Sequence, residues 1–143
     1  MEYPELALHT FTNRPWSISE CIEHYARRGI GGISIWRETI AGQDLAKVRR
    51  QMADAGIRPV AHVRGGFFTG RTAEDRSRAM EVNRECVREA EALGLPMIVL
   101  VCGATPGQTP RENYGQIRDG IAEMAGWAAE VGCKLTTEQH HPL

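Results

Sequence analysis

The end of the sequence carries the residues best suited to metal or proton chemistry. Glu138, His140 and His141 place one carboxylate and two imidazoles within four residues, shortly after an apolar run that begins near Lys134. Carboxylate oxygens and imidazole nitrogens are ligands for Mn²⁺, Mg²⁺, Co²⁺ or Zn²⁺. A catalytic divalent ion usually needs three or more protein ligands, so a complete site requires donors from other segments. The alternative interpretation is a polar, frayed chain end.

Other apolar segments also end in side chains that could surround a ligand. Successive side chains of a strand alternate between its two faces, so every second residue shares a face. The resulting sets are His9 with Phe11, Ser34 with Trp36, His62 with Arg64, and Thr136 with Glu138. An ionisable group buried without a partner costs several kcal/mol, so these ends must contact solvent, one another, a ligand or a metal. His9 and His62 are equally compatible with hydrogen bonds in a packed interior, and Trp36 with simple core packing.

A glycine-rich turn follows the third of these segments. Residues 64–70 have the sequence Arg-Gly-Gly-Phe-Phe-Thr-Gly. The glycines would let the backbone approach a substrate, and Arg64 could hold a carboxylate or a phosphate. A flexible connecting loop is the alternative. No Gly-Lys-Ser/Thr follows the glycines at 103–107, and no GxGxxG follows the first segment, so neither a phosphate-binding loop nor a dinucleotide site is predicted.

Strand-forming runs alternate with helical patterns along the chain. The runs begin near Leu6, Ile33, Pro59, Met97 and Lys134. Helix caps are predicted at Ser17 with Glu20, at Asp44 and at Thr109 before Pro110. The predicted buried stripe of the third helix consists of Ala79, Val82, Cys86, Ala90 and Leu93. Short links between strand and helix predict parallel strands and an α/β fold.

The repeat length predicts a partial barrel. Strand starts lie roughly 32 residues apart, and eight such units would fill the roughly 250 residues of a (β/α)8 barrel. We therefore expect residues 1–143 to form a single domain, the N-terminal half of such a barrel, with four βα units and a fifth strand. A flavodoxin-like doubly wound sheet needs a similar length and the same alternation. Periodicity alone leaves both open.

Composition limits the partners and the compartment. The 143 residues carry 17 Lys+Arg and 18 Asp+Glu with no run of one sign, which argues against nucleic acid and membrane surfaces as partners. No apolar run is long enough to span a bilayer and no signal peptide is evident, so the cytoplasm is expected. The four cysteines lack any CxxC spacing and are interpreted as reduced packing residues.

The element order, the Arg64-Gly65-Gly66-Phe67-Phe68 turn and the segment Glu138-x-x-His141-Pro142 together resemble a known family. The chain is similar to the N-terminal part of the sugar phosphate isomerase/epimerase family, the xylose-isomerase-like TIM barrels. Glu138-x-x-His141-Pro142 resembles the Glu-Pro-Leu-His-Pro at the end of the fifth strand in that family, with Gln139 and His140 in place of Pro-Leu. The similarity covers essentially the whole chain and indicates the superfamily rather than the reaction.

The resemblance implies a metal-assisted proton transfer next to the carbonyl of a sugar or cyclitol. Glu138 would bind a divalent metal (Mn, Mg, Co or Zn) and shuttle the proton. The residues that would surround the substrate are His9, Trp36, His62, Arg64, Phe67 and His141. The family's other metal ligands come from strands six to eight, which this chain does not contain, so we expect weak or no metal binding and no catalysis by the chain alone.

Two further hypotheses remain open from the sequence. The first is a non-catalytic module whose open sheet pairs through its first and fifth strands with a second copy or with the missing half. The second is a fragment of an endonuclease IV-like phosphodiester hydrolase, which shares the fold, although the chain lacks a basic surface.

Overall fold

Five parallel strands form one sheet in which the spatial order follows the chain order. The computed structural model describes residues 2–138. The strands are β1 (Tyr3–His9), β2 (Ile30–Trp36), β3 (Arg58–Gly66), β4 (Met97–Val101) and β5 (Lys134–Thr137). Each strand pairs in parallel with the next, so all carboxyl ends lie at one end of the sheet. Parallel α/β folds place their ligands at this end.

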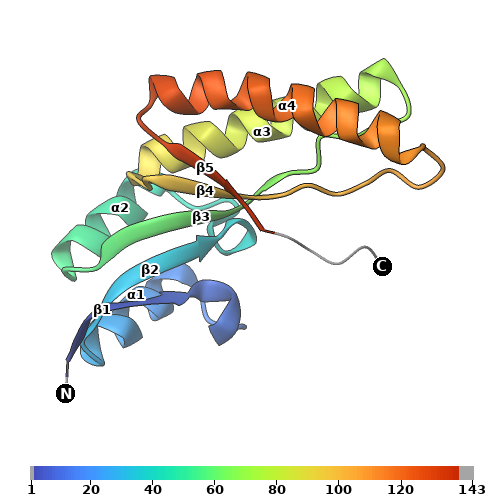
Figure 1. Ribbon diagram of the computed structural model, residues 1–143. Coiled ribbons are helices and arrows are strands. Elements are labelled where there is room, and N and C mark those ends of the chain that lie inside the picture. The colour runs from blue at the N-terminus through green and yellow to red at the C-terminus, as the bar shows by residue number, and fades with distance from the viewer. Residues whose placement is uncertain (1, 139–143) are drawn as a thin grey trace.

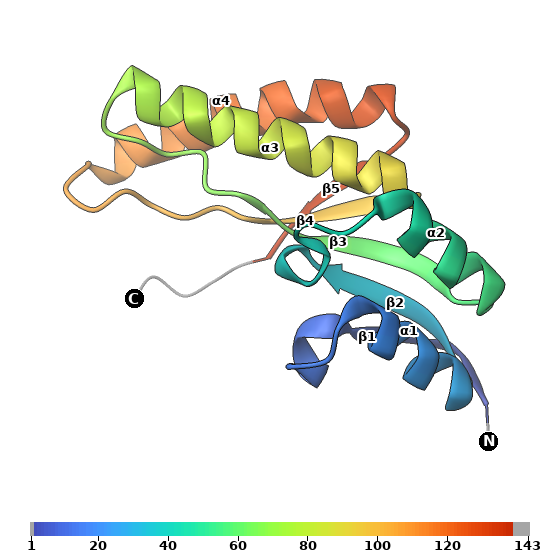
Figure 2. The ribbon, with the colours of Figure 1, turned by 180° about the vertical axis from the view of Figure 1, so that it is seen from behind.

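The helices lie on the outer side of the curved sheet, as the two opposite views show (Figures 1 and 2). They are α1 (Ile18–Arg27), α2 (Leu45–Asp54), α3 (Ala73–Leu93) and α4 (Pro110–Glu130). Two short 3-10 helices, η1 (Thr10–Asn13) and η2 (Arg37–Ile40), follow β1 and β2. A doubly wound sheet would have the order 2-1-3-4-5 and helices on both faces. The observed order and one-sided layer exclude it and match a barrel opened after its fifth strand.

Three of the four helices begin where their capping residues were predicted. Ser17 and Glu20 form a capping box at α1, Asp44 accepts a hydrogen bond from the Lys47 amide at α2, and Thr109 caps α4. Each cap satisfies amide groups that the first helical turn leaves without partners. Strands β1 and β2 begin three residues earlier than the apolar runs suggested, at Tyr3 and Ile30.

The hydrophobic core fills the layer between sheet and helices. Its strand residues include Ile33, Ile35, Ile98 and Leu100, all 0% exposed. The prediction for the buried stripe of α3 was wrong at one position, because Val82 is 53% exposed. Asn83 takes the inward position and is 1% exposed, because its amide finds backbone partners there.

The opposite face of the sheet carries no helix in the described part of the chain, and β1 and β5 form its two edges (Figure 1). Tyr3 and Leu6 on β1 are each 46% exposed. The four cysteines are free, as predicted. None of the helices between residues 2 and 138 combines the length and apolar character needed to cross a membrane.

Candidate functional site

The carboxyl ends of β1, β2 and β3 bring four of the predicted substrate residues into one continuous group. The His9 ring centroid lies 5.7 Å from that of Trp36. The guanidinium carbon of Arg64 lies 5.0 Å from the centroid of the Trp36 ring and 4.8 Å from that of Phe67. Phe11 joins the group at 4.6 Å from Trp36. We call His9, Phe11, Trp36, Arg64 and Phe67 the aromatic-arginine group.

Backbone contacts fix the β1 and β2 part of this group. The Nδ1–H of His9 donates to the Ser34 carbonyl at 3.1 Å, which orients the imidazole on the face without helices. The buried Thr10 hydroxyl accepts from the Trp36 amide at 2.8 Å and lies 3.1 Å from the Thr39 hydroxyl. These contacts tie η1 to η2 and hold the two rings at adjacent strand ends.

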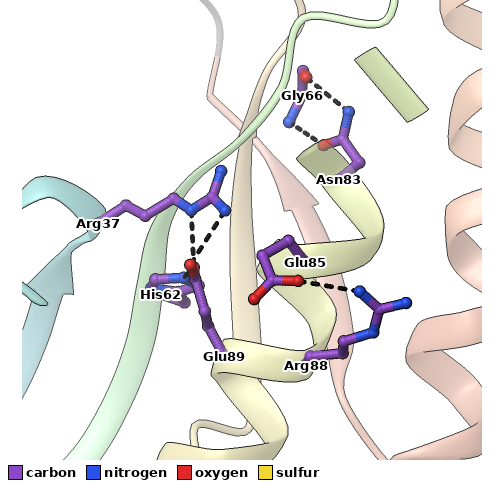
Figure 3. A network of polar contacts seen from close by, with 7 residues as sticks. All are labelled: Arg37, His62, Gly66, Asn83, Glu85, Arg88 and Glu89. Atoms are coloured by element: carbon purple, nitrogen blue, oxygen red, sulfur yellow. Dashed lines mark hydrogen bonds and ion pairs between the residues drawn. The ribbon is translucent and has the colours of Figure 1, made fainter. Parts of the chain in front are cut away.

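Asn83 on α3 fixes the turn after β3. Its side-chain oxygen accepts from the Gly66 amide at 2.7 Å, and its NH₂ donates to the Gly66 carbonyl at 2.8 Å (Figure 3). Gly66 has φ 106°, and a Cβ there would lie 2.4 Å from the Val101 carbonyl oxygen, so no larger residue fits. The next residue, Phe67, is left-handed at φ 58° and donates its amide to Val101 at 3.0 Å. This turn directs the Phe67 ring over Arg64.

Glu138 lies at the same carboxyl end of the sheet, just after β5 and two strands from β3. Its amide donates to the Leu100 carbonyl at 3.0 Å, which extends the β4–β5 pairing beyond Thr137. Leu135 packs against the core, so alternation places Glu138 on the opposite face, which carries the aromatic-arginine group. Two strand spacings correspond to roughly 10 Å between the ends of β3 and β5. His141 lies outside the described residues.

His62 does not join this group, and the prediction that His62 and Arg64 share one face of the sheet is wrong. His62 is 0% exposed and pairs in register with Ile35 and Ile98 on the helix-covered face. The β3–β4 register shifts between Val63 and Gly65, and a Cβ on Gly65 would also meet the helix layer. The alternation is therefore interrupted after His62, and Arg64 reaches the rings instead.

His62 belongs to a charged cluster beneath the sheet (Figure 3). Glu89 on α3 accepts from His62 Nε2 at 2.8 Å and from Arg37 Nε at 2.6 Å, and its other oxygen accepts from Arg37 at 3.0 Å. Burial alone would raise the pKa of Glu89, but the hydrogen bonds from His62 and Arg37 outweigh it and hold that pKa below its ordinary value. The Glu89 hydrogen bonds raise the pKa of Arg37. Arg37 and Glu89 were not predicted from the sequence.

The donors present do not fit a catalytic metal by themselves. Between residues 2 and 138, the only group of three or more His, Cys, Asp and Glu side chains placed to share an ion is His62, Cys86 and Glu89, with ligand atoms within 4.8 Å of one another. Arg37 already neutralises Glu89, and burial raises the pKa of the Cys86 thiol to about 12, which opposes formation of a metal-binding thiolate. This cluster also lies on the opposite face from Glu138.

Two cavities adjoin the aromatic-arginine group. One of about 500 Å³ lies between η1 and η2 and is lined by Arg14, Trp16, Trp36, Glu38 and Gln43 among others. A second of about 270 Å³ is lined by residues that include Arg37, Glu38, Arg64, Gly66, Phe67 and Asn83. Both include residues at or just after the carboxyl ends of strands, and their volumes are of the order that small ligands occupy.

The sequence matches a family of known fold over most of its length. The family model described as xylose isomerase-like TIM barrel matches residues 22–142. The chain belongs to this family. The sheet of five parallel strands with an outer layer of four helices is thus a part of the TIM barrel of the xylose isomerase-like family, as the sequence predicted.

Solved structures extend this result. Protein SMc04130 from Sinorhizobium meliloti 1021 is 31% identical with a TM-score of 0.88, over 96% of this chain and 51% of that one. The IolI protein with a bound zinc atom has 18% identity and a TM-score of 0.80, over 92% and 50% of the two chains. A D-allulose 3-epimerase from Methylomonas sp., in complex with D-allulose, has 20% identity and a TM-score of 0.73, over 96% and 52%.

The chain therefore spans about half the length of these three solved structures. The likenesses to IolI and to the epimerase establish the shared fold. No curated protein matches the sequence.

Proposed function

We propose that this chain is the N-terminal half of a sugar isomerase or epimerase of the xylose isomerase-like family. In the complete barrel it would take part in proton transfer next to a carbonyl carbon of a sugar or cyclitol. The aromatic-arginine group carries the proposal, because it assembles rings and a cation at the carboxyl ends of three strands. The similarity of the fold to a D-allulose 3-epimerase supports the substrate class.

Glu138 is the residue that we propose for the proton transfer. A carboxylate can remove the proton on the carbon next to a carbonyl and return it to the same or the neighbouring carbon. Its place at the end of β5 would put it beside a sugar that rests on Trp36 and Phe67. The rings would cover the apolar face of the sugar and exclude water from the reacting carbon.

A divalent metal in the complete barrel would need donors beyond residues 2–138. Glu138 would supply one ligand, and the remaining ligands would have to come from outside the described part of the chain. We therefore propose that this chain alone binds Mn²⁺ weakly and lacks activity. Titration with Mn²⁺ can be monitored by NMR through the broadening of nearby amide resonances. It should show weak binding, and Glu138→Gln should weaken that binding further. Equal broadening in both proteins would remove Glu138 from the proposed site.

Sugar binding can be tested on the chain itself. Its three tryptophans give three indole N–H resonances, of which Trp36 lies in the aromatic-arginine group and Trp127 lies on the helix layer over Arg84. D-Allulose or D-fructose should shift the Trp36 resonance and leave that of Trp127 in place. Trp36→Leu should weaken binding, whereas Trp127→Leu should not. Equal shifts at Trp36 and Trp127 would contradict a sugar site on this face.

Proton transfer can be tested after the barrel is completed. The chain would be joined to the carboxyl-terminal half of the Sinorhizobium meliloti protein, and deuterium uptake from D₂O into D-fructose would be followed by NMR. Glu138→Gln should reduce uptake by a factor of about 10² or more, the usual contribution of a positioned base. The exposed Glu130→Gln on α4 serves as the control. Undiminished uptake with Glu138→Gln would assign the base to another residue.

A further inference from the structure

We propose that Arg64 binds an oxyanion of the substrate, so that the sugar handled at this site carries a carboxylate or a phosphate. This inference rests on the proposed function and narrows its substrate class. It follows from the ring contacts of the Arg64 guanidinium and its lack of an ion pair within residues 2–138, from the cavity beside it and from the charges that face that cavity.

The guanidinium of Arg64 is held in place without being neutralised. Its carbon lies 5.0 Å from the Trp36 centroid and 4.8 Å from the Phe67 centroid, so two rings fix its position. No carboxylate of residues 2–138 forms an ion pair with it, in contrast to neighbouring Arg37, which binds Glu89 through two hydrogen bonds. Contact with rings engages the faces of a guanidinium and leaves its N–H edges for a planar acceptor.

The cavity of about 270 Å³ gives these donors a place to act. Besides Arg64 it is lined by Arg37, by the Gly65–Gly66 backbone, by Phe67 and by the α3 residues Ala79 and Val82. Asn83 also lines it, but its amide is engaged by the Gly66 and Ala79 backbone. A small volume with one rigid, uncompensated cation suits an oxyanion better than an extended neutral sugar.

Among the described residues that line this cavity, Glu38 is the only one whose charge opposes anion binding. It is exposed, lines the same cavity and lies outside ion-pair distance of Arg64. Arg37 contributes little net charge, because Glu89 neutralises it. An anion therefore meets attraction from Arg64 and weaker, solvent-screened repulsion from Glu38. The two residues should change anion affinity in opposite directions.

The test compares three sugars on the full chain by calorimetric titration. The probes are D-fructose, D-fructose 6-phosphate and D-glucuronate, which present no anion, a phosphate and a carboxylate. We expect at least one anionic sugar to bind tenfold or more tightly than D-fructose, and the tighter of the two identifies the oxyanion. Arg64→Met should weaken binding of the anionic sugar far more than that of D-fructose, so that the preference is lost, and Glu38→Gln should increase the preference.

Control variants separate a binding role from a structural one. Arg84 on α3 makes a similar contact with Trp127, 4.3 Å from the ring centroid, on the helix-covered side, so Arg84→Met should leave all affinities unchanged. If Arg64→Met fails to fold, Arg64→Lys can replace it. This variant keeps the charge without the planar guanidinium, so it should retain part of the preference for the anionic sugar. Binding of all three sugars with equal affinity would overturn this inference alone. Binding of none of them would overturn the proposed function as well.

Discussion

Glu89 shows how a single side chain connects the sheet to the helix layer. It lies on α3, yet it accepts hydrogen bonds from His62 in the middle of β3 and from Arg37 just after β2. An ionised carboxylate only accepts, so His62 donates through Nε2 and its buried Nδ1 has no partner in the described residues. Glu89 therefore supplies a hydrogen-bond acceptor to the partly buried Arg37 guanidinium and to the fully buried His62 ring, which would otherwise lack one.

Glu89→Gln should destabilise the fold by about 1.5–3 kcal/mol at pH 7, the range for hydrogen bonds to charged groups. The folded-state pKa of Glu89 lies below its ordinary value of 4.5, so its contribution is complete above that pH and is lost as pH falls through the folded-state value. The difference in unfolding free energy between wild type and variant should therefore narrow below about pH 4.5. Urea denaturation across pH 3–7 measures it.

Glu85→Gln is the matched control for this variant. Glu85 lies one turn earlier on α3 and pairs only with the exposed Arg88 among the described residues (Figure 3). Its loss should change stability by less than about 1 kcal/mol, as for other surface pairs. A constant difference between Glu89→Gln and wild type over the whole pH range would argue against the charge of Glu89 as the source of stability.

Asn83→Ala should both destabilise the protein and disturb the site. It removes the partners of the buried Gly66 amide and carbonyl, which we expect to cost about 2–4 kcal/mol. The released turn should also move Phe67 away from Arg64, a change visible in the Phe67 ring resonances. Asn113→Ala removes a similar buried amide that binds the Thr105 backbone, and it should cost stability without moving Phe67. Unchanged Phe67 resonances in Asn83→Ala would show that other contacts hold the turn.

At the scale of elements, helix α4 contains three glycines with different surroundings. A Cβ on Gly126 would meet nothing within 4 Å, whereas a Cβ on Gly120 would lie 2.5 Å from the ring of buried Phe68. Gly126→Ala should therefore raise stability by up to about 1 kcal/mol through helix propensity. Gly120→Ala should lower it by about 1–3 kcal/mol through overpacking. Thermal and urea unfolding of the two variants would measure both changes in stability. Changes of the same sign would contradict this prediction.

Elements were predictable from sequence where local chemistry decides them. Ser17, Asp44 and Thr109 begin helices because their side chains satisfy free amides, and this needs no distant partner. The contact between Trp36 at the end of β2 and Arg64 near the end of β3 was predictable because the carboxyl ends of parallel strands lie together.

Features that depend on distant partners were not predictable. His62 was assigned to the wrong face because the register shift after Val63 is set by pairing with β4. Glu89 and Asn83 were missed because their roles depend on strand residues that pack beside α3. Val82 was predicted to be buried from its residue type alone. The structure instead buries Asn83, whose side-chain amide binds the backbone of Gly66.

In the described part of the chain, no helix covers the inner face of the sheet, and β1 and β5 each pair with a neighbouring strand on one side only (Figure 1). In the complete barrels that this chain matches, it corresponds to about half of the length. An edge strand offers unpaired amides and carbonyls, and β1 adds the half-exposed Leu6. Such edges favour pairing with another chain, either a second copy or the remaining half of a barrel.

The isolated chain should therefore self-associate, and its average mass in sedimentation equilibrium should rise with concentration. Leu6→Lys should shift the association to concentrations at least tenfold higher, because a charged residue on an edge strand disfavours pairing. Val82→Lys places the same charge at a similarly exposed apolar position on α3, which packs on β3 and β4 rather than on an edge strand, so it should leave the association unchanged. An equal effect of both variants would indicate non-specific association of exposed apolar residues. A monomer at all concentrations would mean that the open edge is protected within the chain itself.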